Sequence, residues 1–129
     1  MKTKVLIVDD DVAITQQLFW TLCDEFEVMT ANSLSSAIRR ATIYEPDIAI
    51  LDLHLPPTLD APDTSLRILD YVKSHLPGSK VFVASSDPSV EMRKDCILRG
   101  ADGFFDKPLD VERLLSTVRR TAVAARLAA

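Results

Sequence analysis

The sequence contains only two cysteines, Cys23 and Cys96, among its 129 residues. Two cysteines are too few for a disulfide framework or for a structural zinc site, so we expect both to be buried thiols in a reducing compartment. The chain also lacks a basic-then-apolar leader, and none of its apolar runs approaches the ~20 residues that a bilayer span requires. These absences predict a cytoplasmic protein with no membrane partner.

Basic residues are fewer than acidic ones: 15 Lys and Arg stand against 19 Asp and Glu, which gives a formal net charge of −4. Binding to a phosphate backbone needs basic side chains clustered on one face, so we expect no direct nucleic acid binding by this chain. The length predicts one domain over residues 1–129, in which 120–129 end the last helix or begin a linker to an output domain.

Short apolar runs rich in valine and isoleucine predict five strands, at residues 5–8, 27–31, 47–51, 80–85 and 103–105. The stretches between them place apolar residues at helical spacing. They predict helices at residues 12–23, 34–44, 66–76, 90–99 and from 111 towards the C-terminus. This alternation predicts the α/β class, with right-handed crossovers and a doubly wound parallel sheet of five strands. Helix N-caps are expected at Asn32 or Ser33, at Asp63 or Thr64, and at Asp110.

Two of the predicted strands end in aspartates. Asp9, Asp10 and Asp11 follow strand 5–8, and Asp52 follows strand 47–51. Ligands of an open parallel sheet bind beyond the carboxyl ends of its strands, so these carboxylates are expected to converge there. Convergent carboxylates repel one another unless a cation lies among them, and carboxylates together with phosphate and water suit Mg²⁺. An aspartate beside magnesium can also act as a nucleophile and form an aspartyl-phosphate.

Two further strand ends carry side chains that a phosphoryl site needs. Phosphoryl transfer depends on positioning and charge neutralisation, so it requires a cation and a hydroxyl near the phosphoryl oxygens. Ser85 ends strand 80–85, and Lys107 lies just past strand 103–105. Taken alone, each of these residues has an ordinary interpretation as a helix cap, a loop acid or a surface cation. Their occurrence at successive strand ends favours a shared site.

Four segments resemble the response-regulator receiver family of two-component signalling. They are VLIVDD (5–10), ILDLHLP (50–56), VFVASS (81–86) and GADGFFDKP (100–108), and they occur in the family's order over essentially the whole chain. The resemblance implies a (βα)5 flavodoxin-like receiver fold with strand order 2-1-3-4-5. It also implies a cis peptide bond between Lys107 and Pro108.

The resemblance implies a role for each strand-end residue. Asp52 would be the phosphoacceptor of a histidine kinase or phosphotransfer protein, and Asp9 and Asp10 would hold Mg²⁺ together with it. Lys107 would bind the phosphoryl group, and Ser85 would be the switch hydroxyl. Such a chain is a signalling phosphoacceptor and not an enzyme, apart from self-phosphorylation from small donors and autodephosphorylation.

The resemblance also implies how phosphorylation reaches the surface. Ser85 and Lys107 would move towards the added phosphoryl oxygens, and Phe104, at the family's switch-aromatic position, would turn inward. The surface of helix 90–99, strand 103–105 and the last helix would change as a result. An output domain, a partner protein or a second copy of the chain would bind there. Because Phe104 lacks a hydroxyl, its role should be steric, and a plain core aromatic is the alternative.

The chain departs from the family pattern around the phosphoacceptor. Loop 53–64 is a few residues longer than usual, and 57–64 contains no glycine where the family often has an Asp-Gly pair. His54 and Asp87 lie two positions after Asp52 and Ser85, where residues of this family tune how water reaches the phosphoryl group. Solvated loop residues are the alternative interpretation of both.

Three other functions share part of this pattern. A phosphatase with an aspartate nucleophile usually carries a second acid two positions later, where this chain has His54. A flavodoxin-like redox carrier needs a phosphate-cradling loop after the first strand, where three aspartates would repel the anion. A receiver-like domain that binds partners without phosphorylation is disfavoured because the acids, the hydroxyl and the lysine are all present.

Overall fold

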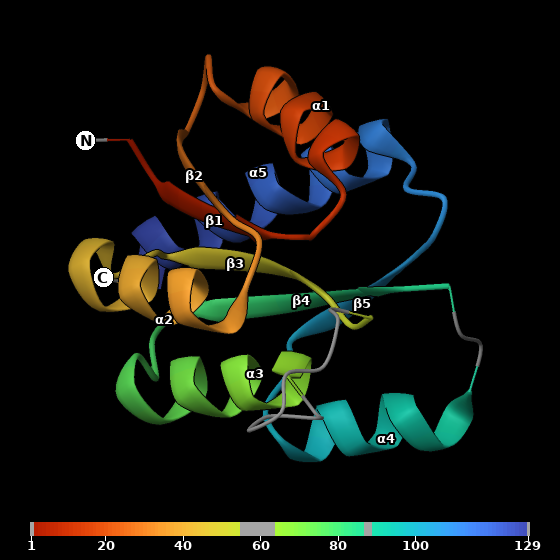
Figure 1. Ribbon diagram of the computed structural model, residues 1–129. Coiled ribbons are helices and arrows are strands. Elements are labelled where there is room, and N and C mark those ends of the chain that lie inside the picture. Colours follow the sequence, from red (N-terminus) through yellow and green to blue (C-terminus); the bar gives the residue numbers. More distant parts are fainter. Residues whose placement is uncertain (1, 55–63, 87–88, 129) are drawn as a thin grey trace.

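The computed structural model describes residues 2–54, 64–86 and 89–128. Strands and helices alternate along these ranges, as Figure 1 shows: β1 (Lys4–Val8), α1 (Val12–Leu22), β2 (Glu27–Ala31), α2 (Leu34–Tyr44), β3 (Ile48–Asp52), α3 (Thr64–His75), β4 (Lys80–Ser85), α4 (Val90–Leu98), β5 (Gly103–Asp106) and α5 (Val111–Ala128). The predicted elements are present, with small shifts at their ends. One shift matters for the site: the prediction that the third strand stops before Asp52 is wrong, because Asp52 still aligns with Ala84 of β4.

The strands form one parallel sheet in the order β2-β1-β3-β4-β5. Figure 1 places α1 and α5 on one face of this sheet and α2, α3 and α4 on the other. The doubly wound topology and the strand order that the sequence implied are therefore confirmed. In this order β1, β3 and β4 are the central strands, so their carboxyl ends lie next to one another.

Alternate residues of each central strand enter two separate cores. On β1, Val5 and Ile7 pack with Leu18 of α1 and Leu114 of α5. Leu6 and Val8 pack on the opposite face with residues of α2 and α3 such as Leu69. Because both faces are covered, every position in such a strand is apolar, which explains the uninterrupted runs in the sequence.

Side-chain caps fix where several helices begin, among them α1, α2 and α5. Asp11 accepts from the backbone N–H groups of Ala13 and Ile14 at the start of α1. Ser33 caps α2 in a capping box with Ser36, so Ser33 and not Asn32 is the cap. Asp110 accepts from the N–H of Arg113 (3.2 Å), as expected for the cap of α5. Of the alternatives for α3, Thr64 is the first helical residue and Asp63 lies outside the described residues.

The helices differ in how firmly they are anchored. α5 buries Leu114, Val118 and Ala122, and its Arg119 donates to the carboxylate of Glu25, just after α1. This guanidinium lowers the pKa of Glu25. By contrast, α4 buries one side chain, Cys96, among its nine residues, all of which the structure describes.

The two cysteines are free thiols, as expected, but they differ in exposure. Cys96 is buried, and burial raises the pKa of its thiol. Cys23 is only half-buried, so the prediction of two buried thiols is wrong at this position. Cys23 follows the last residue of α1, where the helix end no longer covers it fully. Among the described helices, we find none whose length and apolar content would allow it to cross a bilayer.

Candidate functional site

The carboxylates of Asp9, Asp10 and Asp52 meet at the carboxyl edge of the sheet. Val8 of β1 aligns with Leu51 of β3, so the residues that follow them are neighbours. One oxygen from each aspartate lies within 4.8 Å of the others. Asp9 and Asp52 are only 4% and 3% exposed, whereas Asp10 is exposed to water. The predicted convergence of the acids is therefore present in the fold.

Backbone N–H groups orient the two buried carboxylates. Oδ1 of Asp9 accepts from the N–H of Asp11 (2.9 Å), and Oδ1 of Asp52 accepts from the N–H of His54 (3.0 Å). Burial, chiefly, and the nearby charge of Asp52 raise the pKa of Asp9, although the Asp11 N–H and Lys107 partly oppose this shift. Burial and a neighbouring negative charge both disfavour the ionised carboxylate, so a nearby cation stabilises it.

Lys107 lies between the two buried acids. Its Nζ is 3.1 Å from Oδ2 of Asp9 and 3.1 Å from Oδ1 of Asp52, and its side chain is 18% exposed. Burial alone would lower the pKa of Lys107, but the hydrogen bonds and charges of Asp52 and Asp9 outweigh it and raise that pKa. The ammonium is thus charged at neutral pH. The peptide bond to Pro108 is cis, as the resemblance implied.

The three acids fit a small, hard cation. Mg²⁺ takes carboxylate oxygens together with several waters in octahedral geometry. Two buried carboxylates and the exposed Asp10 offer such oxygens on a side that water can reach. Burial is the main cause of the raised pKa of Asp9, and the charge of Asp52 adds to it, while Lys107 opposes both only in part. The donor set is therefore able to bind a metal ion.

Ser85 and His54 adjoin the acids. Ser85 is the last residue of β4 and is 8% exposed, and its Oγ lies 2.8 Å from Nε2 of His54 in a hydrogen bond. The backbone oxygen of Ser85 accepts from the N–H of Lys107 (2.9 Å), which joins the ends of β4 and β5. The structure thus pairs the main chain of Ser85 with that of Lys107 and places the Ser85 hydroxyl beside His54, whose N–H binds Asp52. Asp87 and most of loop 53–64 lie outside the described residues.

This edge lies within a stretch of the chain that matches a known protein family. The model of the response regulator receiver domain matches residues 5–119. The chain belongs to this family. It is the receiver domain of a two-component response regulator, and the family match leaves the redox-carrier and phosphatase alternatives without support.

Relatives with known names agree with this family. The receiver domain is 32% identical over 124 residues to the probable transcriptional regulatory protein TcrX of Mycobacterium tuberculosis, over 92% of this chain and 51% of TcrX. It is 35% identical over 119 residues to PrrA of the same species, over 90% of this chain and 48% of PrrA. The chain therefore spans about half the length of these curated relatives.

Two solved structures share the fold with this chain over nearly the whole length of both proteins compared. The chemotaxis response regulator CheY4 of Vibrio cholerae is 29% identical, with a TM-score of 0.82 over 94% of this chain and 99% of CheY4. The receiver domain of NtrX from Brucella abortus is 30% identical, with a TM-score of 0.79 over 91% of this chain and 96% of that one.

Phe104 of the receiver domain lies in a setting that the sequence did not predict. It is half-buried on β5 and packs against the core beneath α3 and α4. The guanidinium of Arg93 in α4 lies 5.7 Å from the centre of its ring and also binds Asp106 (2.5 Å). Phe104 is thus a half-buried ring beside a guanidinium and not a fully buried core aromatic. Its role as a switch stays a prediction.

Ser65 lies next to the site although no prediction from the sequence named it. Its hydroxyl is buried at the start of α3 and donates to the backbone oxygen of Asp52 (2.7 Å). No sequence signal distinguishes Ser65 from other serines, because the contact depends on how the chain returns from loop 53–64. The bond fixes the main chain that carries the Asp52 side chain.

Replacing Ser65 by alanine should lower the free energy of unfolding by about 1 kcal/mol, because the buried Asp52 carbonyl loses a donor. Urea denaturation measures this loss. Ser86→Ala, at an exposed serine, is the matched control and should stay within about 0.5 kcal/mol of the original chain. Equal effects of the two substitutions would show that the Ser65 bond contributes nothing.

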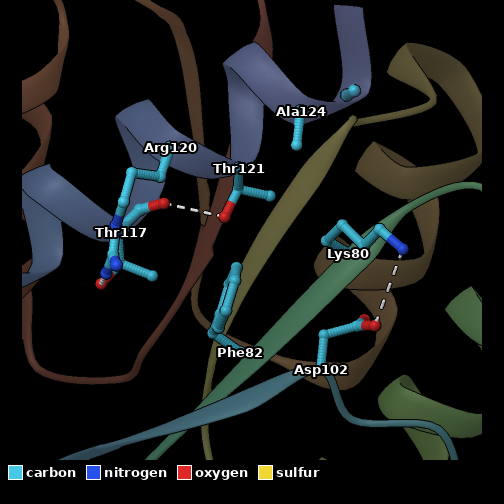
Figure 2. A pocket seen from close by; sticks show the side chains of 8 residues that line it. Lys80, Phe82, Asp102, Thr117, Arg120, Thr121 and Ala124 are labelled. Atoms are coloured by element: carbon cyan, nitrogen blue, oxygen red, sulfur yellow. Dashed lines mark hydrogen bonds and ion pairs between the residues drawn. The ribbon is translucent and has the colours of Figure 1, made fainter. Parts of the chain in front are cut away.

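A cavity of about 540 Å³ lies elsewhere in the receiver domain, between α5 and β4 (Figure 2). In Figure 2 the Phe82 ring points from β4 towards Thr117 and Thr121 of α5. Lys80, the first residue of β4, borders the cavity, whereas Ser85 stands at the opposite end of the same strand. The cavity is therefore separate from the acidic site.

Proposed function

We propose that Asp52 accepts a phosphoryl group from a histidine kinase, a phosphotransfer protein or a small donor, and that Mg²⁺ is the metal of this reaction. The observation that carries the proposal is the place of Asp52 between Asp9, Asp10 and the Lys107 ammonium, 3.1 Å away. A carboxylate that lies beside an ammonium group, and beside two acids able to hold a metal ion with it, is arranged to receive a phosphoryl group, because both cations would neutralise charge on the phosphoryl oxygens.

The transfer needs one bond to form and one to break. An Asp52 carboxylate oxygen bonds to phosphorus while the phosphorus–nitrogen bond of a phosphohistidine, or the phosphorus–oxygen bond of acetyl phosphate, breaks. The leaving group keeps the electron pair. Asp9, Asp10 and Asp52 would hold Mg²⁺, which neutralises negative charge on the phosphoryl oxygens. Lys107 supplies a further positive charge, and the Ser85 hydroxyl supplies a hydrogen-bond donor.

The phosphoryl group stays on the chain, so we propose a signalling phosphoacceptor whose chemistry is limited to self-phosphorylation and autodephosphorylation. The signal would leave through α4, β5 and α5, where Phe104 and Arg93 lie. An output domain, a partner protein or a second copy would bind this surface. We propose one domain over residues 1–129, and the cytoplasmic location, like the effect of His54 and Asp87 on water access, stays a prediction.

Acetyl phosphate tests the proposal directly. With Mg²⁺, the chain should gain one phosphoryl group in an intact-mass measurement, and the product should be labile to hydroxylamine because it is an acyl phosphate. Excess EDTA should prevent the gain. Borohydride reduction followed by peptide mapping should place the modification on Asp52. A label on another residue, or none with Mg²⁺ present, would contradict the proposal.

A further inference from the structure

His54 makes two hydrogen bonds that connect the phosphoacceptor with the switch hydroxyl. Its backbone N–H donates to Oδ1 of Asp52 (3.0 Å), and its ring Nε2 lies 2.8 Å from Oγ of Ser85. The preceding residue, Leu53, donates its N–H to the oxygen of Ala84 (2.9 Å), so this part of the chain stays beside β4. The imidazole is thereby held at the end of the strand that carries Ser85.

We propose that the hydrogen bond between His54 and Ser85 stabilises the unphosphorylated arrangement. It thereby sets the free energy that phosphorylation must supply to turn the Ser85 hydroxyl towards the phosphoryl group. His54 acts as a positioning residue, through Ser85. This inference rests on the proposed function of Asp52. It differs from an effect on water access, because water access changes the rate at which a phosphoryl group is lost and not the equilibrium between two arrangements.

The physical reason is competition for one hydroxyl. A serine side chain occupies one staggered rotamer at a time, so an Oγ that turns towards a phosphoryl group on Asp52 leaves the imidazole. A ligand shifts the equilibrium only by its differential affinity for the two arrangements. Loss of this one hydrogen bond from the resting arrangement therefore makes binding of a phosphoryl mimic about two- to tenfold tighter.

Beryllofluoride with saturating Mg²⁺ is the probe, since it mimics the phosphoryl group on an aspartate without turnover. We expect His54→Ala to bind it about two- to tenfold more tightly than the original chain, as measured by NMR titration. Mg²⁺ affinity without beryllofluoride should be unchanged. His75→Ala is the matched control, because this second histidine stacks on Tyr71 in α3 and makes no described contact with the acidic site. It should leave beryllofluoride affinity unchanged.

A double-mutant cycle separates the proposed role from a general effect of the substitution. In a Ser85→Ala background no hydroxyl competes, so adding His54→Ala should leave beryllofluoride affinity unchanged. Tighter binding that persists without the hydroxyl, or an unchanged or weaker affinity of His54→Ala itself, would overturn the inference alone. Failure of the original chain to bind beryllofluoride with Mg²⁺ would instead overturn the proposed function of Asp52, and the inference with it. His54 is exposed, so its truncation is compatible with folding.

Discussion

Replacing Asp52 by asparagine is expected to lower the rate of labelling by acetyl phosphate by roughly 10²-fold or more. An amide is a poor nucleophile, and the substitution also removes one of three carboxylates whose oxygens lie within 4.8 Å of one another. Binding of Mg²⁺ should weaken for the second reason. The fold should persist, because Lys107 still contacts Asp9 (3.1 Å) and the amide oxygen can still accept from the N–H of His54.

Asp11→Asn is the matched control for this experiment. Asp11 is in the same acidic run, but its side chain caps α1 by accepting from Ala13 and Ile14, and asparagine is an equally good cap. The control removes one negative charge near the site and leaves the three clustered acids in place. It should be labelled at nearly the original rate. If both variants lose the label, general negative charge and not Asp52 governs the reaction.

Replacing Lys107 by methionine should have the largest effect on stability, a loss of about 3 kcal/mol in the free energy of unfolding without Mg²⁺. The lysine contacts both Asp9 and Asp52, which are almost fully buried, so its removal leaves two like charges without a cation. Urea denaturation in EDTA measures the loss. Phosphorylation should also slow, because a positive charge beside the phosphoryl oxygens is gone.

Magnesium distinguishes this explanation from a simple packing defect. A cation held by the three acids offsets their repulsion, so Mg²⁺ should stabilise Lys107→Met more than it stabilises the original chain. Lys80→Met is the control: its Nζ is 3.9 Å from Asp102, and its half-exposed side chain should contribute no more than about 0.5 kcal/mol. A deficit of Lys107→Met that is the same with and without Mg²⁺ would count against the electrostatic explanation.

The acids could be predicted from the sequence because parallel topology decides where strand ends lie. Once β1 and β3 are neighbours, the residues that follow Val8 and Leu51 must meet, whatever their side chains do. The place of Lys107 could be predicted by the same rule, because this residue comes directly after the carboxyl end of β5. The order of the strands came from the family resemblance, since alternation alone fits more than one order.

The contacts that the sequence did not predict depend on side-chain rotamers and on the placement of helices. The bond from His54 to Ser85 joins residues 31 positions apart, and the bond from Ser65 to Asp52 spans 13. The contact of Arg93 with Phe104 depends on where α4 is placed and on the rotamer that brings the guanidinium to 5.7 Å from the ring centre. The partial exposure of Cys23 likewise depends on where α1 ends. Local pattern carries none of this information.

The single buried side chain of α4 has a consequence for how this helix moves. A helix anchored mainly by Cys96 can open by local unfolding at a free energy below that of unfolding the whole domain. Opening α5 requires a higher free energy, because three buried side chains and the bond to Glu25 hold it. The amides of α4 would then exchange with solvent deuterium through brief openings that leave the sheet intact. A partner could therefore capture α4 in conformations that α5 does not sample.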